Sequence, residues 1–161
     1  MGAETAIFAA GCFWGVETHF AGISGVTVTE VGYSGGKTRE PTYKEVCSDT
    51  TGHAEVVRVK FDPNALSYAE LLAAFWECHD PTQLNQQGPD FGTQYRSAIF
   101  CHDEEQLTAA QSSLEAAQPR FDGGIVTQVE PAQEFWRAEE YHQYYLSKNS
   151  ISCGLLSSET D

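Results

Sequence analysis

Segments with strand-type and helix-type hydrophobic spacing alternate along this chain, and this alternation is what most limits its fold. Strand patterns span residues 5–10, 26–33, 54–61, 95–102 and 125–130. Helical patterns span residues 13–20, 67–78, 103–118 and 138–148. Interleaved strands and helices with long connections predict an α/β (α+β) two-layer sandwich with a mixed sheet. The 161 residues suit one domain, and the aperiodic residues 149–161 are expected to form a mobile tail.

Charge and cysteine content exclude several classes of protein. A formal net charge of -14 argues against nucleic acid or an anionic membrane as partner, because both require a basic surface. No apolar run approaches the roughly 20 residues needed to span a bilayer, and no signal peptide is expected. The five cysteines are scattered, odd in number and never spaced C-x-x-C, which is untypical of a secreted disulfide framework or a zinc knuckle. A reducing, cytoplasmic compartment is therefore expected.

Cys12 occupies the position best suited to a reactive thiol. It lies where a predicted strand passes through Gly11 into a predicted helix, and free amides at a helix start stabilise a thiolate. By position alone, a small buried structural cysteine fits equally well. Phe13 and Trp14 follow directly, and such aromatics either belong to the core or form the wall of a pocket for a thioether-like group.

Glu55 stands on the apolar face of its predicted strand. Residues 54–61 alternate so that Glu55 shares a face with Val57 and Val59, opposite Arg58 and Lys60. Burial there would keep the carboxyl protonated near neutral pH and allow it to act as an acid. By pattern alone, however, a glutamate near the start of a strand more often projects from the sheet edge into solvent.

Other residues are weaker candidates for a site. Tyr43 and Tyr95 adjoin turns, where their hydroxyls can face a cleft, and Asp90 lies in the long loop of residues 80–94, where turn capping is its usual role. Cys153, in the tail, is placed to form a disulfide with another thiol or to remain unused. The five histidines show no metal-ligand spacing, and any of them could in principle assist Cys12 as a hydrolase base.

A set of ordered motifs resembles one known family. The segment Gly11-Cys12-Phe13-Trp14-Gly15-Val16-Glu17 is followed by motifs at residues 31–36, 41–43, 52–57, 79–82, 87–97 and 141–143. Together they resemble the peptide-methionine (S)-S-oxide reductases, the A type of methionine sulfoxide reductase, over residues 6–148. Departures lie near the C-terminus: Tyr144 stands where an acidic residue is frequent, and the tail around Cys153 has less glycine than is usual.

The resemblance implies a role for each matching residue. Cys12 would be the nucleophile that attacks the sulfoxide sulfur and becomes a sulfenic acid. Glu55 would be the acid that protonates the sulfoxide oxygen, and the hydroxyls of Tyr43 and Tyr95 would bind that oxygen.

The same resemblance implies a substrate pocket and a recycling step. Phe13 and Trp14 would enclose the methyl group and select the S epimer, and Asp90 would help to organise the pocket. Cys153 would close a disulfide with Cys12 that thioredoxin or a dithiol reduces. If it does not, another cysteine or an external thiol must meet the sulfenic acid.

The resemblance also predicts a ferredoxin-like core with extended coil segments, no cofactor and no metal. We expect a monomer that repairs oxidatively damaged proteins and acts on free and peptide-bound methionine sulfoxide. Two alternatives stay open from the residues alone. One is a cysteine hydrolase or acyltransferase, which consumes no thiol during turnover, and the other is a module that binds methionine or its sulfoxide without chemistry.

Overall fold

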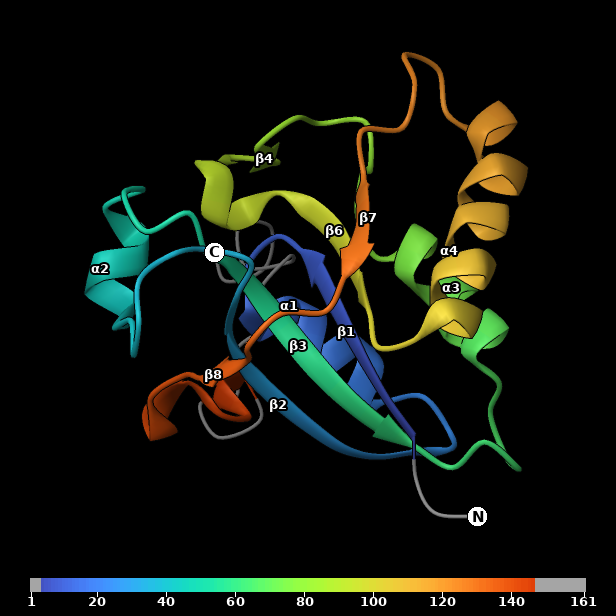
Figure 1. The fold of residues 1–161 in the computed structure, drawn as a ribbon, viewed down its shortest axis with the longest axis horizontal. Coiled ribbons are helices and arrows are strands. Elements are labelled where there is room, and N and C mark those ends of the chain that lie inside the picture. Colours follow the sequence, from blue (N-terminus) through green and yellow to red (C-terminus); the bar gives the residue numbers. More distant parts are fainter. Residues whose placement is uncertain (1–3, 147–161) are drawn as a thin grey trace.

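A six-stranded sheet with the strand order β7-β6-β1-β3-β2-β8 forms the centre of the structure (Figure 1). The computed structural model describes residues 4–146. The strands are β1 (Glu4–Ala10), β2 (Val26–Ser34), β3 (Ala54–Phe61), β4 (Gln86–Gln87), β5 (Asp90–Phe91), β6 (Ser97–Cys101), β7 (Gln128–Pro131) and β8 (Trp136–Arg137). The helices are α1 (Phe13–Ala21), α2 (Tyr43–Cys47), α3 (Tyr68–Glu77) and α4 (Glu104–Ala117), with 3-10 turns at η1 (Thr93–Tyr95), η2 (Gln118–Arg120) and η3 (Glu140–His142).

The inner strands and two helices form the predicted ferredoxin-like core. The elements β1, α1, β2, β3, α3 and β6 follow one another along the chain, and their strands pair antiparallel in the order β6-β1-β3-β2. β7 adds to β6 in parallel, after the crossover through α4, which makes the sheet mixed. The mixed α/β fold class expected from the sequence is therefore confirmed.

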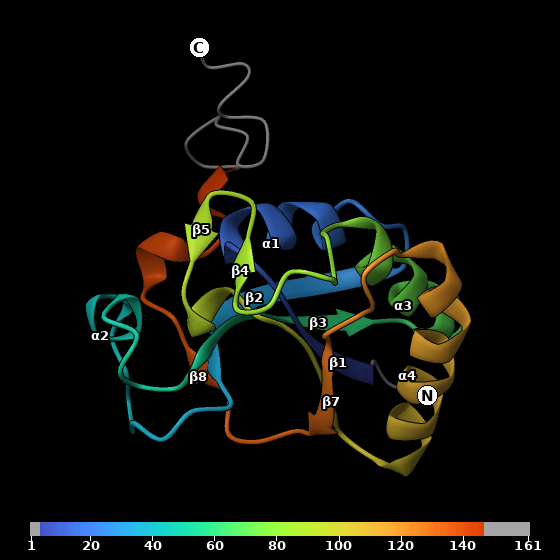
Figure 2. The same ribbon diagram turned by 90° about the horizontal axis from the view of Figure 1, so that it is seen from above.

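The two faces of the sheet are covered differently. Helices α1, α3 and α4 all contribute buried residues to the apolar cluster on one face, together with Phe8, Val57 and Ile99 from the strands. On the other face, a smaller cluster around Val56 and Phe100 is covered by the segment between β7 and β8. Figure 2 shows this segment crossing the side of the sheet opposite α1. The domain thus has two layers, the sheet and the helices on one of its faces, and an extended coil covers the other face.

The predicted helix over residues 138–148 is wrong for residues 138–144, whereas residues 145 and 146 are helical. Residues 140–142 form only a 3-10 turn, and Tyr144 has a positive φ of 54°. The reason is tertiary: the Tyr144 backbone amide donates to the Glu17 side chain instead of a helical carbonyl. The Gln143 side-chain amide donates to the carbonyls of Val31 and Ala138 and accepts from the Val31 N–H, which fixes the segment against β2. Residues 147 and 148 and the predicted mobile tail lie outside the described residues.

Short elements and strand ends differ from the pattern. The long loop of residues 80–94 contains a small hairpin, β4–β5. Two strands are shorter or displaced, since β6 begins at Ser97 and β7 at Gln128. The pattern did not predict α2 or β8, although Thr42 and Glu45 form a capping box that marks the start of α2.

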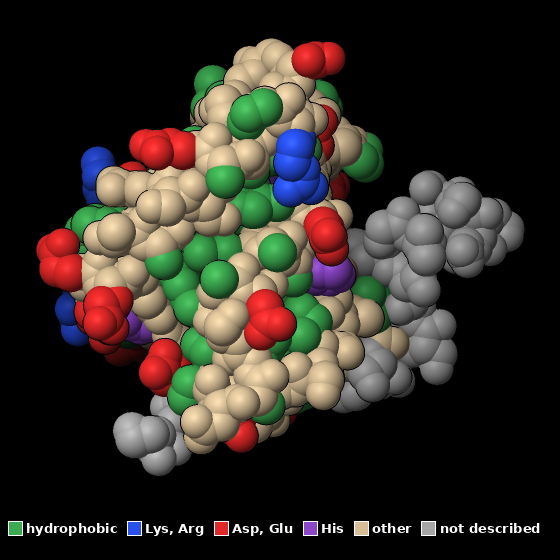
Figure 3. Space-filling view, turned by 90° about the vertical axis from the view of Figure 1, so that its right-hand side faces the viewer, with side chains coloured by type: hydrophobic (Ala, Val, Ile, Leu, Met, Phe, Trp, Pro, Cys, Tyr) green, Lys and Arg blue, Asp and Glu red, His purple; other side chains and the backbone are tan. Residues whose placement is uncertain are grey.

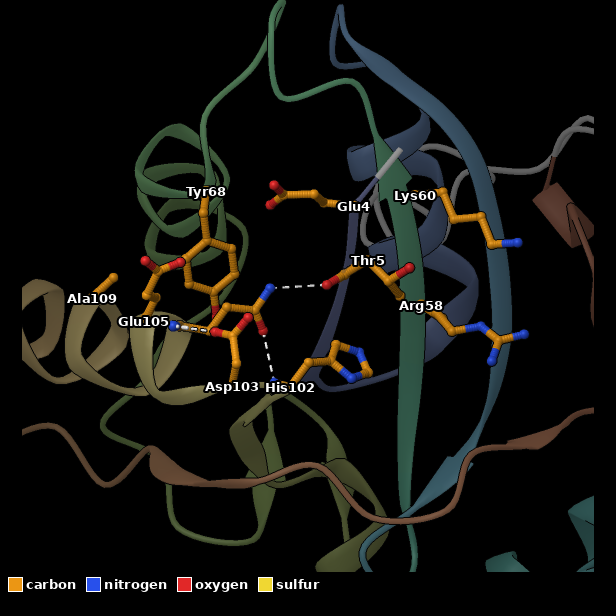
Figure 4. A pocket seen from close by; sticks show the side chains of 10 residues that line it. Glu4, Thr5, Arg58, Lys60, Tyr68, His102, Asp103, Glu105 and Ala109 are labelled. Atoms are coloured by element: carbon orange, nitrogen blue, oxygen red, sulfur yellow. Dashed lines mark hydrogen bonds between the residues drawn. The ribbon is translucent and has the colours of Figure 1, made fainter. Parts of the chain in front are cut away.

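A surface hollow of about 740 Å³ lies at the far end of β1, away from Gly11 and Cys12. Thr5, Lys60 and His102 line it, and Gln106 links the carbonyl of Thr5 to the amide of His102 (Figure 4). The space-filling view in Figure 3 shows scattered acidic side chains and few lysines or arginines on one face. Among residues 4–146, no helix is long and apolar enough to cross a membrane.

Candidate active site

Cys12 lies at the junction between the end of β1 and the start of α1, as the alternation of patterns predicts. It is the N-cap residue of α1 and is partly buried. The preceding Gly11 has a φ of 106°, and a Cβ there would come within 2.9 Å of the Gln87 side chain from the β4–β5 hairpin. Glycine therefore allows both the sharp turn and the close approach of the hairpin to the cysteine.

The Glu55 carboxyl is buried directly beside this junction. Its side chain is 1% exposed, and Oε1 accepts the amide hydrogen of Phe13 at 3.1 Å. The residue projects from the helix-covered face of β3, where it pairs across the sheet with Tyr33. The prediction that Glu55 faces inward is confirmed, and its sheet-edge alternative is wrong.

Tyr43 and Tyr95 approach Glu55 from α2 and η1. Burial raises the pKa of both phenols, and ionisation of the neighbouring Glu55 would raise it further, so both hydroxyls are protonated at neutral pH. The charges of Asp90 and Cys12 also act on Tyr95, and burial raises the pKa of the Asp90 carboxyl. These residues from separate loops are therefore gathered around one buried carboxyl.

Aromatic rings form the remaining wall of the site. Phe13 is 1% exposed, and its ring lies 6.3 Å from that of Tyr43. Trp14 stacks on Tyr145 with ring centroids 3.9 Å apart, and its Nε1–H donates to His142 Nδ1 at 3.0 Å. The indole is thus held on two sides, by a stacked ring and by a hydrogen bond.

Two residues of the site were not singled out by sequence reasoning. His142 belongs to the motif at residues 141–143, which gave it no role, and it is fully buried among Phe13, Trp14 and Tyr43. Glu139 accepts from the Tyr33 hydroxyl and from the Tyr43 amide, both at 2.9 Å, and so holds the start of α2 against β2. Burial and the bond to Glu139 raise the pKa of Tyr33, which keeps this donor protonated.

The remaining cysteines occupy different surroundings. Cys153 lies outside the described residues. Cys47, at the end of α2, is exposed, and its thiol interacts with Tyr43 beside the site. Burial raises the pKa of the Cys78 thiol to about 12, and Cys101 is buried in the core. In the part of the chain that the structure describes, no group of three or more His, Cys, Asp and Glu side chains is placed to hold a metal ion.

Comparison with known proteins identifies the family. The family model described as Peptide methionine sulfoxide reductase matches residues 4–159. The chain belongs to this family. A relative from Geobacter sulfurreducens, named peptide methionine sulfoxide reductase MsrA, is 59% identical over 90% of this chain and 91% of its own length.

Solved structures of the reductase family share the fold. Methionine sulfoxide reductase A of Corynebacterium diphtheriae has a TM-score of 0.90 and 41% identity, and the match covers 93% of this chain and 76% of that one. Mxr1 from Saccharomyces cerevisiae, in complex with Trx2, has a TM-score of 0.65 and 25% identity, with coverage of 89% and 85%.

Proposed function

We propose that this chain is a peptide-methionine (S)-S-oxide reductase that uses Cys12 as its nucleophile and Glu55 as its acid. Its membership of the family supports the reaction, and one observation carries the assignment of residues. The Glu55 carboxyl is bonded to the amide of Phe13, the residue directly after Cys12, so that acid and thiol flank the same small space.

The first step transfers the sulfoxide oxygen to Cys12. The free amides at the start of α1 favour the thiolate, which attacks the sulfoxide sulfur. Burial favours the neutral carboxyl of Glu55, and since Oε1 accepts the Phe13 amide, Oε2 is the oxygen that would carry the proton. Sγ of Cys12 would bond to the sulfoxide sulfur while Glu55 gives its proton to the oxygen. The protonated oxygen would then pass to Sγ as the new S–S bond and the S–O bond to methionine break, so that Cys12 is oxidised to a sulfenic acid and the sulfoxide sulfur is reduced by two electrons to the thioether of methionine.

Tyr43 and Tyr95 would bind the sulfoxide oxygen. Their raised pKa values keep both hydroxyls able to donate a hydrogen bond as negative charge develops on that oxygen. Phe13 and Trp14 would receive the methyl group, so that the substrate's other substituents point outward only in the S epimer. Asp90 would support the pocket from the β4–β5 hairpin.

The second step would return Cys12 to its thiol form. Cys153 would attack the sulfenic sulfur, form a disulfide with Cys12 and release water, and thioredoxin would reduce that disulfide. The complex of the related Mxr1 with Trx2 supports thioredoxin as the partner. Should Cys153 not serve, an external dithiol or Cys47, whose thiol interacts with Tyr43, would take its place. We further propose a cytoplasmic monomer that repairs oxidised proteins.

A single-turnover experiment tests this function. Fully reduced protein is mixed with excess methionine-S-sulfoxide without reductant, and methionine and remaining thiols are counted. We expect one methionine and two lost thiols per chain, with peptide mapping to locate the disulfide. A second methionine with further thiol loss would indicate a relay through another cysteine. Thiols that stay intact while the sulfoxide merely binds would favour a binding module, and acyl-ester turnover without thiol loss would favour a hydrolase.

A further inference from the structure

Glu17, the last residue of the first motif, lies in a buried ring of hydrogen bonds that the proposed reaction does not use. Its side chain is 2% exposed on α1. Oε1 accepts the Tyr144 amide hydrogen at 2.8 Å, and Oε2 accepts the Thr29 hydroxyl hydrogen at 2.9 Å. The Thr29 amide in turn donates to the Tyr144 hydroxyl at 3.3 Å, which closes the ring between α1, β2 and the last described segment.

The ring holds a backbone turn that most residues avoid. Tyr144 has a φ of 54°, in the left-handed region where a side chain with a Cβ is disfavoured. Such conformations persist only where surrounding contacts fix them. Here the bond from the Tyr144 amide to the buried Glu17 carboxyl supplies that contact.

The turn separates the two partners of Trp14. His142, just before it, accepts the indole hydrogen, and Tyr145, just after it, stacks on the indole at 3.9 Å. Trp14 itself lies on α1, three residues before Glu17 and therefore on the same side of the helix. One helix thus carries both the indole and the carboxyl group that fixes the turn beside it.

We propose that Glu17 is a positioning residue for the reductase reaction: by fixing the left-handed turn at Tyr144, it sets the stacking of Tyr145 on Trp14 and so the wall that meets the substrate's methyl group. This inference rests on the proposed function, in which Trp14 receives that methyl group. Glu17 itself touches neither the substrate nor the reacting atoms.

A matched pair of substitutions at Glu17 separates hydrogen bonding from packing. Glu17→Gln keeps an acceptor for the Tyr144 amide, whereas Glu17→Met has similar length and no comparable acceptor. In single turnovers, we expect Glu17→Met to raise the half-saturating concentration of methionine-S-sulfoxide about tenfold, as the loss of one good ring contact implies. The limiting rate should change little, and Glu17→Gln should stay within about threefold of the wild type.

The size of the substrate's alkyl group gives a readout that loss of general stability would not move. With the Trp14 wall displaced, Glu17→Met should lose part of the preference for methionine sulfoxide over ethionine sulfoxide. Alkylation of Cys12 by iodoacetamide should keep its wild-type rate, and Glu105→Gln, on the exposed surface of α4, serves as the surface control. Equal behaviour of the Met and Gln variants, or an unchanged methyl-to-ethyl preference, would overturn the proposal.

A second pair avoids the buried position in case Glu17→Met does not fold. Tyr144 is 43% exposed, and asparagine tolerates its left-handed conformation whereas valine does not. Tyr144→Val should reproduce the weaker binding and the lost preference, and Tyr144→Asn should bind several-fold better than Tyr144→Val. Equal half-saturating concentrations of methionine-S-sulfoxide for Tyr144→Val and Tyr144→Asn would overturn the role of the turn. If wild-type protein forms no methionine, the proposed function fails, whatever these variants do.

Discussion

The carboxyl of Glu55 accepts the amide hydrogen of Phe13 at 3.1 Å, so the buried acid is joined to the peptide unit that follows Cys12. The bond links β3 to the first turn of α1 across 42 residues of sequence. It orients the carboxyl towards the cysteine and satisfies one free amide of the helix start. The predictions below depend on this arrangement and on the elements that maintain it.

Replacement of Glu55 by glutamine should slow methionine formation by roughly 10²–10⁴-fold, the range for loss of a general acid. Glutamine has the same shape and can still accept the Phe13 amide, so the fold should persist, but it cannot deliver a proton. Stopped-flow single turnovers measure the rate, and circular dichroism checks the fold. A wild-type rate in the folded variant would show that Glu55 is not the acid.

Replacement of Cys12 by serine should abolish reduction while leaving sulfoxide binding measurable. The pocket formed by Phe13, Trp14 and Tyr43 is intact in this variant, but a hydroxyl is a far weaker nucleophile than a thiolate. Calorimetric titration with methionine-S-sulfoxide tests whether binding is kept, and an assay of methionine tests whether reduction is lost. Methionine production by the serine variant would contradict the assignment of the nucleophile.

Removal of either phenol hydroxyl, by Tyr43→Phe or Tyr95→Phe, should lower the single-turnover rate by roughly tenfold, the value of one hydrogen bond to a charged oxygen. Because both hydroxyls would bind the same oxygen, each can compensate for the other. The double variant should therefore lose more than the product of the single losses. Tyr68→Phe, which lies in the far hollow, is a matched control with unchanged rate. Strictly additive losses would argue against a shared oxygen.

Gly11→Ala should destabilise the protein by about 1–3 kcal/mol, because a residue with a Cβ is strained at a φ of 106°. The added Cβ would also displace Gln87, which holds the β4–β5 hairpin through bonds to the amide and carbonyl of Asp80. Urea unfolding measures the change in the free energy of unfolding. The same substitution at Gly88, which has a positive φ but open space around it, should cost less, and equal losses would refute the contact with Gln87.

Stability should fall as the pH drops from about 6.5 to 4, partly because of His79. Burial lowers the pKa of His79 to about 4 from its ordinary value of 6.5. Between pH 6.5 and 4 the imidazole of His79 is protonated in the unfolded chain but not in the folded chain. The folded state is therefore not penalised by His79 above pH 6.5, and it loses stability as the pH falls. The contribution reaches roughly 3 kcal/mol near pH 4. Urea unfolding of His79→Asn should show a shallower pH dependence over this window, and an identical one would exclude His79.

The sequence pattern located some elements well and others poorly. β3 spans Ala54–Phe61 as its alternation predicts, since a two-residue period that places Val57 and Val59 on one face and Arg58 and Lys60 on the other leaves a single register. The helix predicted from residue 138 failed over residues 138–144, because the Tyr144 amide bonds to Glu17 and the Gln143 side chain bonds to Val31, while the amides of His142 and Gln143 make 3-10 bonds only. Periodicity is a local signal, and it cannot register a hydrogen bond to a residue more than 100 positions away.

The sequence by itself determined the alternation of strands and helices, the cysteine at the start of α1 and the face of β3 that Glu55 shares with Val57 and Val59. Each of these follows from local spacing, which fixes the element type and the side that meets the core. Only the tertiary structure decided how Tyr43, Tyr95 and Asp90 converge on Glu55, and how Glu17, His142 and Glu139 support the pocket. These positions depend on loop paths, which are set by contacts between distant segments and not by the pattern within any one of them.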